Sequence, residues 1–284
     1  MTRLAIIGPG LLGGSIALAA RRAESFHVAV WARRPEAVAE LEKRAVADSA
    51  STDLAVVVKD ADIVVLAVPI GVMASLARQI VPLLNTGAVV TDVGSVKAPV
   101  VEELNAIFTQ GARFVGSHPM AGSEQTGLEA ARVGLFDDAP CIVTPDADSD
   151  SAAVATIHRF WETLGGRVLE LSPEVHDEIV ALVSHFPHLL AAVLVNLVTE
   201  KNASAFAFAG PGFRDTTRVA SGPPEMWTEI LRSNHTAVRA SVEAMIEKLR
   251  EIATLLDHDA SMTDILTQAK TQRDQLRFPK SSHV

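Results

Sequence analysis

The feature that most restricts the fold lies at the start of the chain, where a short apolar strand runs directly into a glycine-rich turn. Leu4–Ile7 has the composition of a buried strand, and Gly8, Gly10 and Gly13 follow at GxGxxG spacing. The first glycine of this pattern permits a tight turn, the second lets the backbone approach a pyrophosphate, and the third lets the next helix pack on the strand. An Ala- and Leu-rich helix follows, which is the context that the pattern requires. We therefore predict a dinucleotide-binding unit, with a glycine turn that binds no ligand as the alternative.

Strand-like and helix-like segments alternate through the first 171 residues. Helical stretches such as Pro35–Arg44 and Val72–Leu84 separate β-branched runs. This alternation predicts right-handed βαβ units and a mainly parallel sheet. The run Ile63–Val68 is apolar at every position, which is typical of a central parallel strand. The strand candidates are Leu4–Ile7, His27–Trp31, Ile63–Val68, Ala88–Val93, Phe114–Gly116, Cys141–Thr144 and Val168–Leu171.

The pattern becomes helical from Ser172 onward. Ser172 and Pro173 suit a helix cap and a first helical turn, and apolar residues then recur at helical spacing. We expect an α/β fold in which a Rossmann-type domain over residues 1–171 precedes an all-helical dimerisation domain over residues 172–284. The later helix candidates are Pro224–Leu231, His235–Leu256 and Ser261–Arg273, and Phe278–Val284 is expected to be a frayed tail.

Composition excludes several classes of function. The chain has 284 residues, a formal net charge of −9, one cysteine and no tyrosine. The acidic balance argues against a nucleic-acid partner, because phosphate binding requires a basic surface. The single cysteine, Cys141, excludes a disulfide framework, as expected in a reducing compartment. The absence of tyrosine excludes the short-chain dehydrogenases, whose mechanism uses a tyrosine hydroxyl.

Two apolar stretches raise the question of a membrane. Arg3–Ala20 resembles a signal peptide, but its glycines break the apolar helix and fit the turn described above. Ile179–Thr199 has 21 residues without a formal charge, which reaches the length of a membrane span. It also contains Ser184, His185 and Asn196, which favour a helix buried between subunits. We expect a cytoplasmic protein that does not span a membrane.

The residues after the second strand indicate which dinucleotide is bound. NAD sites normally place Asp or Glu about 20 residues past the glycine motif. Here Arg33 and Arg34 occupy this region, and the first acidic residue after Trp31 is Glu36. Guanidinium groups suit a 2′-phosphate, so NADP is preferred, with NAD possible and a solvated arginine pair as the alternative. The candidate cofactor-binding residues are Gly8, Gly10, Leu11, Leu12, Gly13, Arg33, Arg34, Val68, Pro69 and Ser95.

Two polar segments follow predicted strands, where ligands of open α/β sheets bind. Ser95 lies in Asp92–Lys97 and is a candidate contact near the nicotinamide, although it can equally be a helix cap. His118 lies in the Gly-rich segment Gly116–Glu124. A histidine titrates near neutral pH, so His118 is a candidate acid or base, with a structural role as the alternative.

Two further polar segments lie in the helical part. His185 and His188 share one helix face, where they suit a buried polar ligand. With His118 they can also be drawn as a metal site, but no Cys or acidic residue has ligand spacing, and we expect no metal. Asp215 and Arg218 are also three residues apart, and a surface ion pair is the alternative to a role in the site.

Five segments together resemble the prephenate/arogenate dehydrogenase family of tyrosine biosynthesis. They are Gly8–Ser15, Asp92–Lys97, His118–Glu124, Ser184–His188 and Gly212–Arg218, which occur in the family's order within a resemblance from residue 4 to about residue 230. The resemblance implies oxidative decarboxylation of a cyclohexadiene substrate, with hydride transfer to NAD(P)+. It also implies a small-molecule substrate and a twofold homodimer.

The resemblance further implies residue roles. His118 would hydrogen-bond to the ring hydroxyl as a neutral imidazole, with Ser95 beside it, so activity would fall at low pH with an ordinary histidine pKa. Arg218 would capture a carboxylate. Trp227 would reach the neighbouring subunit's site. Glu124 and Asp215 would form an ionic gate, and Ser123, Arg214, His185 and His188 would line the pocket.

Two other functions remain open on sequence alone. β-Hydroxyacid dehydrogenases also join a Rossmann domain to a helical domain, but they use a catalytic lysine there. The lysines after residue 171 are Lys201, Lys248, Lys270 and Lys280, and none has a Gly-rich helix-start context. A non-catalytic dinucleotide sensor would need the glycine turn but not Ser95, His118 and Arg218.

Overall fold

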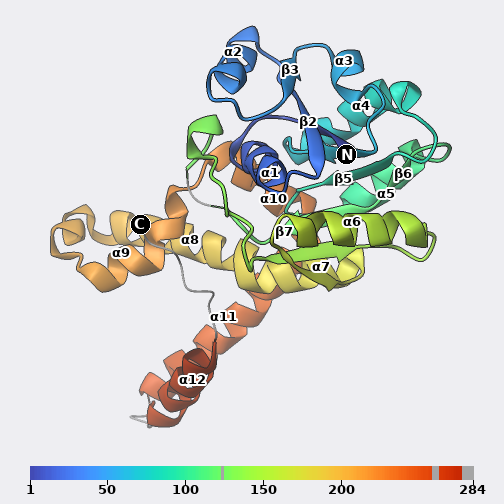
Figure 1. The fold of residues 1–284 in the computed structure, drawn as a ribbon. Helices are drawn as coiled ribbons and strands as arrows, with labels where there is room; N and C mark the ends of the chain where they lie inside the picture. The colour runs from blue at the N-terminus through green and yellow to red at the C-terminus, as the bar shows by residue number, and fades with distance from the viewer. Residues whose placement is uncertain (123–124, 258–261, 277–284) are drawn as a thin grey trace.

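The first part of the chain forms a six-stranded parallel sheet in the order β3-β2-β1-β4-β5-β6 (Figure 1). The structure is a computed structural model that describes residues 1–122, 125–257 and 262–276. The strands are β1 (Thr2–Ile7), β2 (Phe26–Trp31), β3 (Ser49–Ser51), β4 (Ile63–Leu66), β5 (Val89–Asp92) and β6 (Arg113–Phe114). This order has its switch point between β1 and β4, where open α/β sheets bind their ligands.

Helices cover both faces of this sheet. They are α1 (Leu11–Arg22), α2 (Pro35–Lys43), α3 (Leu54–Val58), α4 (Ile70–Ile80) and α5 (Ala98–Ile107), with a short 3-10 turn at Val81–Leu83. Alternate residues of β1 belong to two apolar clusters: Leu4 and Ile6 pack with α1, and Ala5 and Ile7 pack with α4. Burial on both faces explains why the central strands are apolar throughout.

The prediction of one mainly parallel sheet was wrong for its last strands. A separate three-stranded sheet contains β7 (Gly116–Pro119), β8 (Pro140–Thr144) and β9 (Arg167–Glu170), with β7 antiparallel to β8. Along the chain, η2 (Leu128–Ala130) lies between β7 and β8, and α6 (Ser151–Thr163) lies between β8 and β9. Only Val115 separates β6 from β7, so the chain leaves the first sheet after a two-residue strand. The alternating pattern detects such strands but does not identify their partners.

The rest of the described chain, residues 172–257 and 262–276, is helical. Its elements are α7 (Pro173–Val180), η3 (Ala181–His185), α8 (Phe186–Asn202), η4 (Ala203–Phe208), α9 (Pro211–Thr217), η5 (Arg218–Ser221), α10 (Pro224–Ser233), α11 (His235–Asp257) and α12 (Thr263–Gln275). The hydroxyl of Ser172 caps α7, accepting from the backbone of Val175. The predicted tail at Phe278–Val284 lies outside the described residues, and the division at residue 171 stays a prediction.

The uncharged helix contains a π-helical turn that the sequence pattern did not predict. This turn, η3, lies between α7 and α8. Pro187 lacks the N–H that would bond to the carbonyl of Val183 in a regular α-helix, so the wider turn relieves a missing hydrogen bond. A π-turn changes the directions of its side chains relative to a regular α-helix, and Ser184 and His185 belong to this turn.

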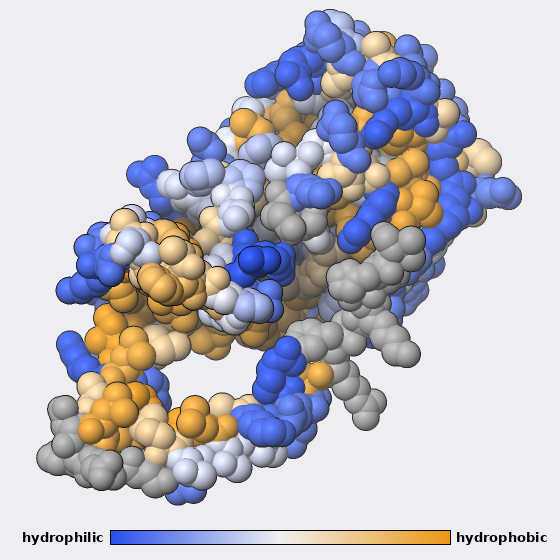
Figure 2. All heavy atoms as spheres, turned by 90° about the vertical axis from the view of Figure 1, so that its left-hand side faces the viewer, coloured by the Kyte–Doolittle hydropathy of each residue, from blue (hydrophilic) through white to orange (hydrophobic). Residues whose placement is uncertain are grey.

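The helical part carries an exposed apolar surface. Figure 2 shows apolar side chains gathered over its protruding helices. Exposed large apolar residues of this surface include Leu182, Val183, Leu190, Val193, Leu197, Phe206, Phe208, Leu249, Leu256 and Leu266. Every described residue of α12 is exposed, and α11 and α12 extend away from the body (Figure 1). By length and composition, the helical run Pro173–Phe208 could cross a membrane, a test that core helices of soluble proteins also pass.

Candidate active site

A cavity of about 630 Å³ lies at the carboxyl ends of β1, β4 and β5. The glycine turn, Ser95 and His118 contribute to one side, and α10 of the helical part closes the other. Glu229 of α10 accepts a hydrogen bond from the backbone of Gly71 in the first turn of α4. The cavity therefore lies between the two parts of the chain. Its lining comprises Gly10, Leu11, Leu12, Ala67, Val68, Pro69, Ile70, Val93, Gly94, Ser95, His118, Pro119, Met120, Ala121, Gly122, Gln125, Thr126, Gly127, Ser184, Pro223, Met226, Trp227, Glu229 and Ile230.

The glycine turn has the geometry that a dinucleotide requires. Gly8 has a φ of +108°, and a Cβ there would lie 2.5 Å from the carbonyl oxygen of Ala67. A Cβ on Gly13 would overlap the carbonyl oxygen of Gly8, so strand and helix meet at backbone contact distance. By contrast, a Cβ on Gly10 would meet no atom of the described residues within 4 Å. The turn is tight where the protein packs and open where a pyrophosphate would lie at the N-terminus of α1.

A buried ion pair fixes the loop of Ser95 against the strand of His118. Lys97 and Asp92 are both fully buried, and the Lys97 ammonium donates to the Asp92 carboxylate and to the carbonyl of Ser117. The same carboxylate accepts from the backbone of Gly94 at 2.8 Å and of Ser117 at 3.1 Å. Burial lowers the pKa of Lys97, and the charges of Asp92 and Asp177 oppose that shift. The network holds β5 and β7 together beneath the cavity.

His118 is the outermost group of a relay of three buried side chains. Its Nδ1 lies 2.9 Å from His176 Nε2, and His176 Nδ1 lies 2.8 Å from Asp177 Oδ1. Asp177 also accepts from the backbone of Lys97 at 2.7 Å and of Ala98 at 2.9 Å, so its carboxylate acts as an acceptor. His176 must then carry its proton on Nδ1, and His118 must donate from Nδ1. This leaves Nε2 of His118 as the unprotonated nitrogen.

Burial keeps this imidazole neutral. Desolvation lowers the pKa of His118 well below its ordinary value, and the nearby His176, Lys97 and His185 lower it further. Desolvation also lowers the pKa of His176. The expectation of a neutral His118 agrees with this environment, but the expectation of an ordinary histidine pKa was wrong, because the ring is 8% exposed.

The sequence matches two family models. They are the nucleotide-binding domain of prephenate dehydrogenase at residues 16–170 and the dimerization domain of prephenate dehydrogenase at residues 172–269. The chain belongs to the prephenate dehydrogenase family. It is 35% identical over 261 residues to cyclohexadienyl dehydrogenase of Zymomonas mobilis, covering 89% of this chain and 88% of the relative.

Solved structures of prephenate dehydrogenase family members have the same fold. Prephenate dehydrogenase of Aquifex aeolicus, in complex with hydroxyphenyl propionate and NAD+, aligns with a TM-score of 0.91 at 30% identity, covering 98% of this chain and 99% of the other. Arogenate dehydrogenase of Synechocystis aligns with a TM-score of 0.85 at 29% identity, covering 96% and 99%. The predicted fold class, a Rossmann-type domain followed by a helical dimerisation domain, is confirmed.

The relay contains two residues of this family member that the sequence analysis missed. His176 and Asp177 are adjacent titratable residues in the first turns of α7, and neither was singled out from the sequence. Their adjacency was the available sequence signal, and the structure shows them 0% and 5% exposed, although amphipathic helices usually place such residues outward. Their function depends on contact with His118, which lies 58 residues away from His176.

The predicted residues of η3 and α8 lie in different layers of the site. Ser184 lines the cavity, whereas His185 is fully buried behind it, with Nδ1 3.1 Å from Asn234 Nδ2. His188 stacks on Trp227, with ring centroids 3.5 Å apart and planes 11° apart. The expectation that Trp227 reaches the neighbouring subunit's site stays a prediction, and within its own chain the stack places the indole in this cavity.

The remaining predicted residues that the structure describes lie outside this cavity. Arg214 and Asp215 belong to α9 and Arg218 begins η5, and all three are exposed. Arg33 and Arg34 are exposed at the carboxyl end of β2. Ser123 and Glu124 lie outside the described residues. Within the described residues, no group of three His, Cys, Asp or Glu side chains is arranged to hold a metal ion.

Proposed function

We propose that this chain catalyses the oxidative decarboxylation of prephenate or arogenate, with hydride transfer to NADP or NAD. The observation that carries the proposal is the unprotonated Nε2 of His118 in the cavity that also contains the open face of the glycine turn. Membership of the prephenate dehydrogenase family supports the same reaction.

The chain's own residues would perform the proton transfer. His118 Nε2 accepts the proton of the substrate's ring hydroxyl, and Ser95 hydrogen-bonds to the same oxygen. His176 and Asp177 hold His118 in the required orientation. A bound nicotinamide supplies the acceptor for the hydride that leaves the carbinol carbon. The ring carboxylate leaves as CO₂, and its bonding electrons enter the ring, which becomes aromatic. The resulting phenolate oxygen takes the proton back from His118, and aromatisation drives the reaction.

The cavity walls would orient the substrate. The indole of Trp227, on which His188 stacks, gives a flat wall beside Ser184. We assign carboxylate capture to Arg218, because a guanidinium can bind a carboxylate through two hydrogen bonds. η5, which contains Arg218, packs against α8, the helix that carries His188. Arg218→Ala should weaken substrate binding while cofactor binding persists, as measured by KM and by cofactor titration.

We also propose that NADP is preferred over NAD. Arg33 and Arg34 follow β2 and are exposed to a ligand that lies along the carboxyl edge of the sheet. Arg33→Ala should raise KM for NADP and leave KM for NAD unchanged. Arg113→Ala is the matched control, because Arg113 is an exposed arginine of β6, at the opposite edge of the sheet from β2 and β3. A preference of the unaltered enzyme for NAD would contradict this assignment.

We propose a cytoplasmic homodimer that does not span a membrane. The exposed apolar residues of α8, including Leu190, Val193 and Leu197, would be covered by a second copy. Sedimentation equilibrium should give twice the mass of the chain without detergent. Val193→Glu should reduce that mass.

One comparison tests the main proposal. Steady-state assays with prephenate and arogenate, each with NADP and NAD, should form CO₂ and reduced cofactor at equal rates. His118→Asn should reduce kcat by about 10²–10⁴-fold, which is the range for loss of an acid–base group. The proposal fails if neither substrate turns over with either cofactor.

A further inference from the structure

The side chain of Asn234 lies where the two halves of the proposed catalytic machinery meet. Its backbone N–H donates to Ile230 at the end of α10, and its carbonyl accepts from Val238 in the first turn of α11. Both backbone polar groups of Asn234 are therefore hydrogen-bonded at the ends of the two helices. The side chain is 6% exposed, and its amide is directed away from both helices toward α7 and η3.

The contacts of this amide determine which way it faces. Asn234 Nδ2 donates to the carbonyl oxygen of Asp177 at 2.8 Å and lies 3.1 Å from Nδ1 of His185. A carbonyl only accepts, so the flipped amide would place two acceptors against each other. The NH₂ group must therefore face both partners. Because NH₂ only donates, Nδ1 of His185 must be an acceptor.

His185 therefore carries its proton on Nε2. Burial lowers the pKa of His185 to about 4, so the ring is neutral at physiological pH. Nε2 is fully buried and has no hydrogen-bond partner of good geometry among the residues described. Desolvation is the main cause of the lowered pKa of His185, and the charge of Asp177 and the backbone of Ser95 oppose that shift. A buried donor without a partner is costly, so the fixed Nε2–H tautomer calls for an explanation.

We propose that Asn234 is a positioning residue that holds His185 in the Nε2–H tautomer beside the Ser95 loop and anchors the backbone of Asp177. Through Asp177 and His176 the same amide supports the orientation of His118. The side chain of Asn234 in the helical part thus connects to Ser95 and His118, the two residues that would contact the substrate's ring hydroxyl. The catalytic consequence of this inference rests on the proposed function. The tautomer of His185 does not depend on that function.

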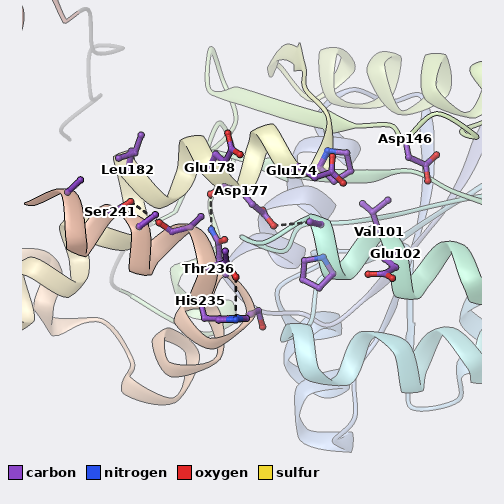
Figure 3. A pocket seen from close by; sticks show the side chains of 18 residues that line it. Val101, Glu102, Asp146, Glu174, Asp177, Glu178, Leu182, His235, Thr236 and Ser241 are labelled. Atoms are coloured by element: carbon purple, nitrogen blue, oxygen red, sulfur yellow. Dashed lines mark hydrogen bonds between the residues drawn. The ribbon is translucent and has the colours of Figure 1, made fainter.

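Asn234 can be substituted without crowding its neighbours, because it borders a second cavity. Asn234 and Asp177 lie in the wall of a space of about 960 Å³ between α5, α7 and α11. Figure 3 shows Asp177 in the wall of this space, with its hydrogen bond to the first turn of α5 drawn as a dashed line. Asn234→Asp is isosteric, so it needs no additional room, and it replaces the NH₂ donor by an acceptor.

Asn234→Asp tests the proposal directly. The carboxylate would accept from Nδ1 of His185, so the tautomer should change to Nδ1–H. Long-range ¹H–¹⁵N spectra of the histidine side chains distinguish the two tautomers, with His185→Gln used to assign the signals. We expect kcat to fall about tenfold or more, in the range for misplaced catalytic groups, while KM for the cofactor stays within twofold. The acid limb of the pH profile should move to higher pH, because the new carboxylate would join Asp177 in raising the pKa of the buried His185.

Asn85→Asp is the matched control. Asn85 is exposed in the turn before β5, so the same chemical change should leave the tautomer of His185, kcat and the pH profile unchanged. An Asn234→Asp protein with wild-type kcat and an unchanged His185 tautomer would overturn the proposal.

A pair of changes at His185 keeps the proposal testable if Asn234→Asp does not fold. Glutamine can place an amide donor near the position of Nε2, whereas asparagine reaches only the position of Nδ1. We expect His185→Gln to lose less kcat than His185→Asn, and the reverse order would contradict the proposal. If wild-type enzyme turns over neither substrate, the proposed function fails, and the ¹⁵N spectra still decide the tautomer.

Discussion

His176 Nε2 lies 2.9 Å from His118 Nδ1, and this contact decides which nitrogen of His118 faces the cavity as a base. His176 is oriented in turn by Asp177, which lies at the N-terminus of α5 and accepts two of its backbone N–H groups. A helix N-terminus favours the negative carboxylate, so the relay has a fixed direction from Asp177 toward the cavity.

The pH dependence of activity should reflect the burial of His118. The neutral ring is the active form, and its pKa lies well below the ordinary value. We therefore expect kcat/KM to stay level as pH falls from about 8 through 6.5, the ordinary histidine pKa, and to decline only below that. A pH profile of kcat/KM in a buffer mixture of constant ionic strength measures this. An inflection at the ordinary histidine pKa would contradict the assignment of His118.

Stability should depend on pH with a definite sign. The pKa of His185 is about 4 in the folded protein and about 6.5 in the unfolded chain. Between these values the unfolded state binds more protons, so the free energy of unfolding rises with pH and becomes level above about 6.5. The slope should be at most about 1.4 kcal/mol per pH unit for this histidine. Urea unfolding at pH 5, 6 and 7.5 measures it, and His185→Gln should have a shallower slope.

The buried ion pair should be strongly coupled. Lys97→Met leaves the Asp92 carboxylate buried without its cation, which costs about 3–5 kcal/mol of stability. Lys97→Met combined with Asp92→Asn removes both charges and should recover much of that loss. Urea unfolding of the single and double variants tests this prediction. If Lys97→Met alone is as stable as the wild type, the pair does not hold β5 and β7 together.

Local sequence patterns predicted those parts of the fold that local packing determines. The glycine turn is an example, because Gly8 and Gly13 are required by contacts within one β–α unit. The antiparallel pairing of Ser117 with Val143 was not predictable in this way, because the two residues are far apart in the chain and either could have joined the parallel sheet.

The residues of the candidate site were likewise predictable only where a local sequence pattern places them. Ser95 and His118 follow strands, so their place at the sheet's carboxyl edge could be expected. His176 was not found, because its role depends on a contact between α7 and β7 that no spacing indicates. The layer occupied by His185 was also missed, since the π-turn before Pro187 alters the helical register on which the shared face was predicted.

The place of Trp227 in its own chain's cavity gives a last prediction. A Cβ on Gly222 would overlap Nε1 of Trp227 and lie 2.8 Å from its Cδ1 and 3.2 Å from Cε1 of His188. Gly222 has a φ of −64°, so alanine fits the backbone and the conflict is purely one of space. Gly222→Ala should displace the indole and raise KM for the ring substrate about tenfold, which corresponds to about 1.4 kcal/mol.

Gly210→Ala is the control for this change. A Cβ on Gly210 would meet no atom of the described residues within 4 Å, so this alanine should leave KM unchanged. Overpacking at Gly222 should also lower stability by about 1–3 kcal/mol, which thermal unfolding can measure separately from KM. If both alanine variants raise KM equally, the stack of His188 and Trp227 does not shape the substrate wall. If only Gly222→Ala raises KM, the position of the indole determines how tightly the ring substrate binds.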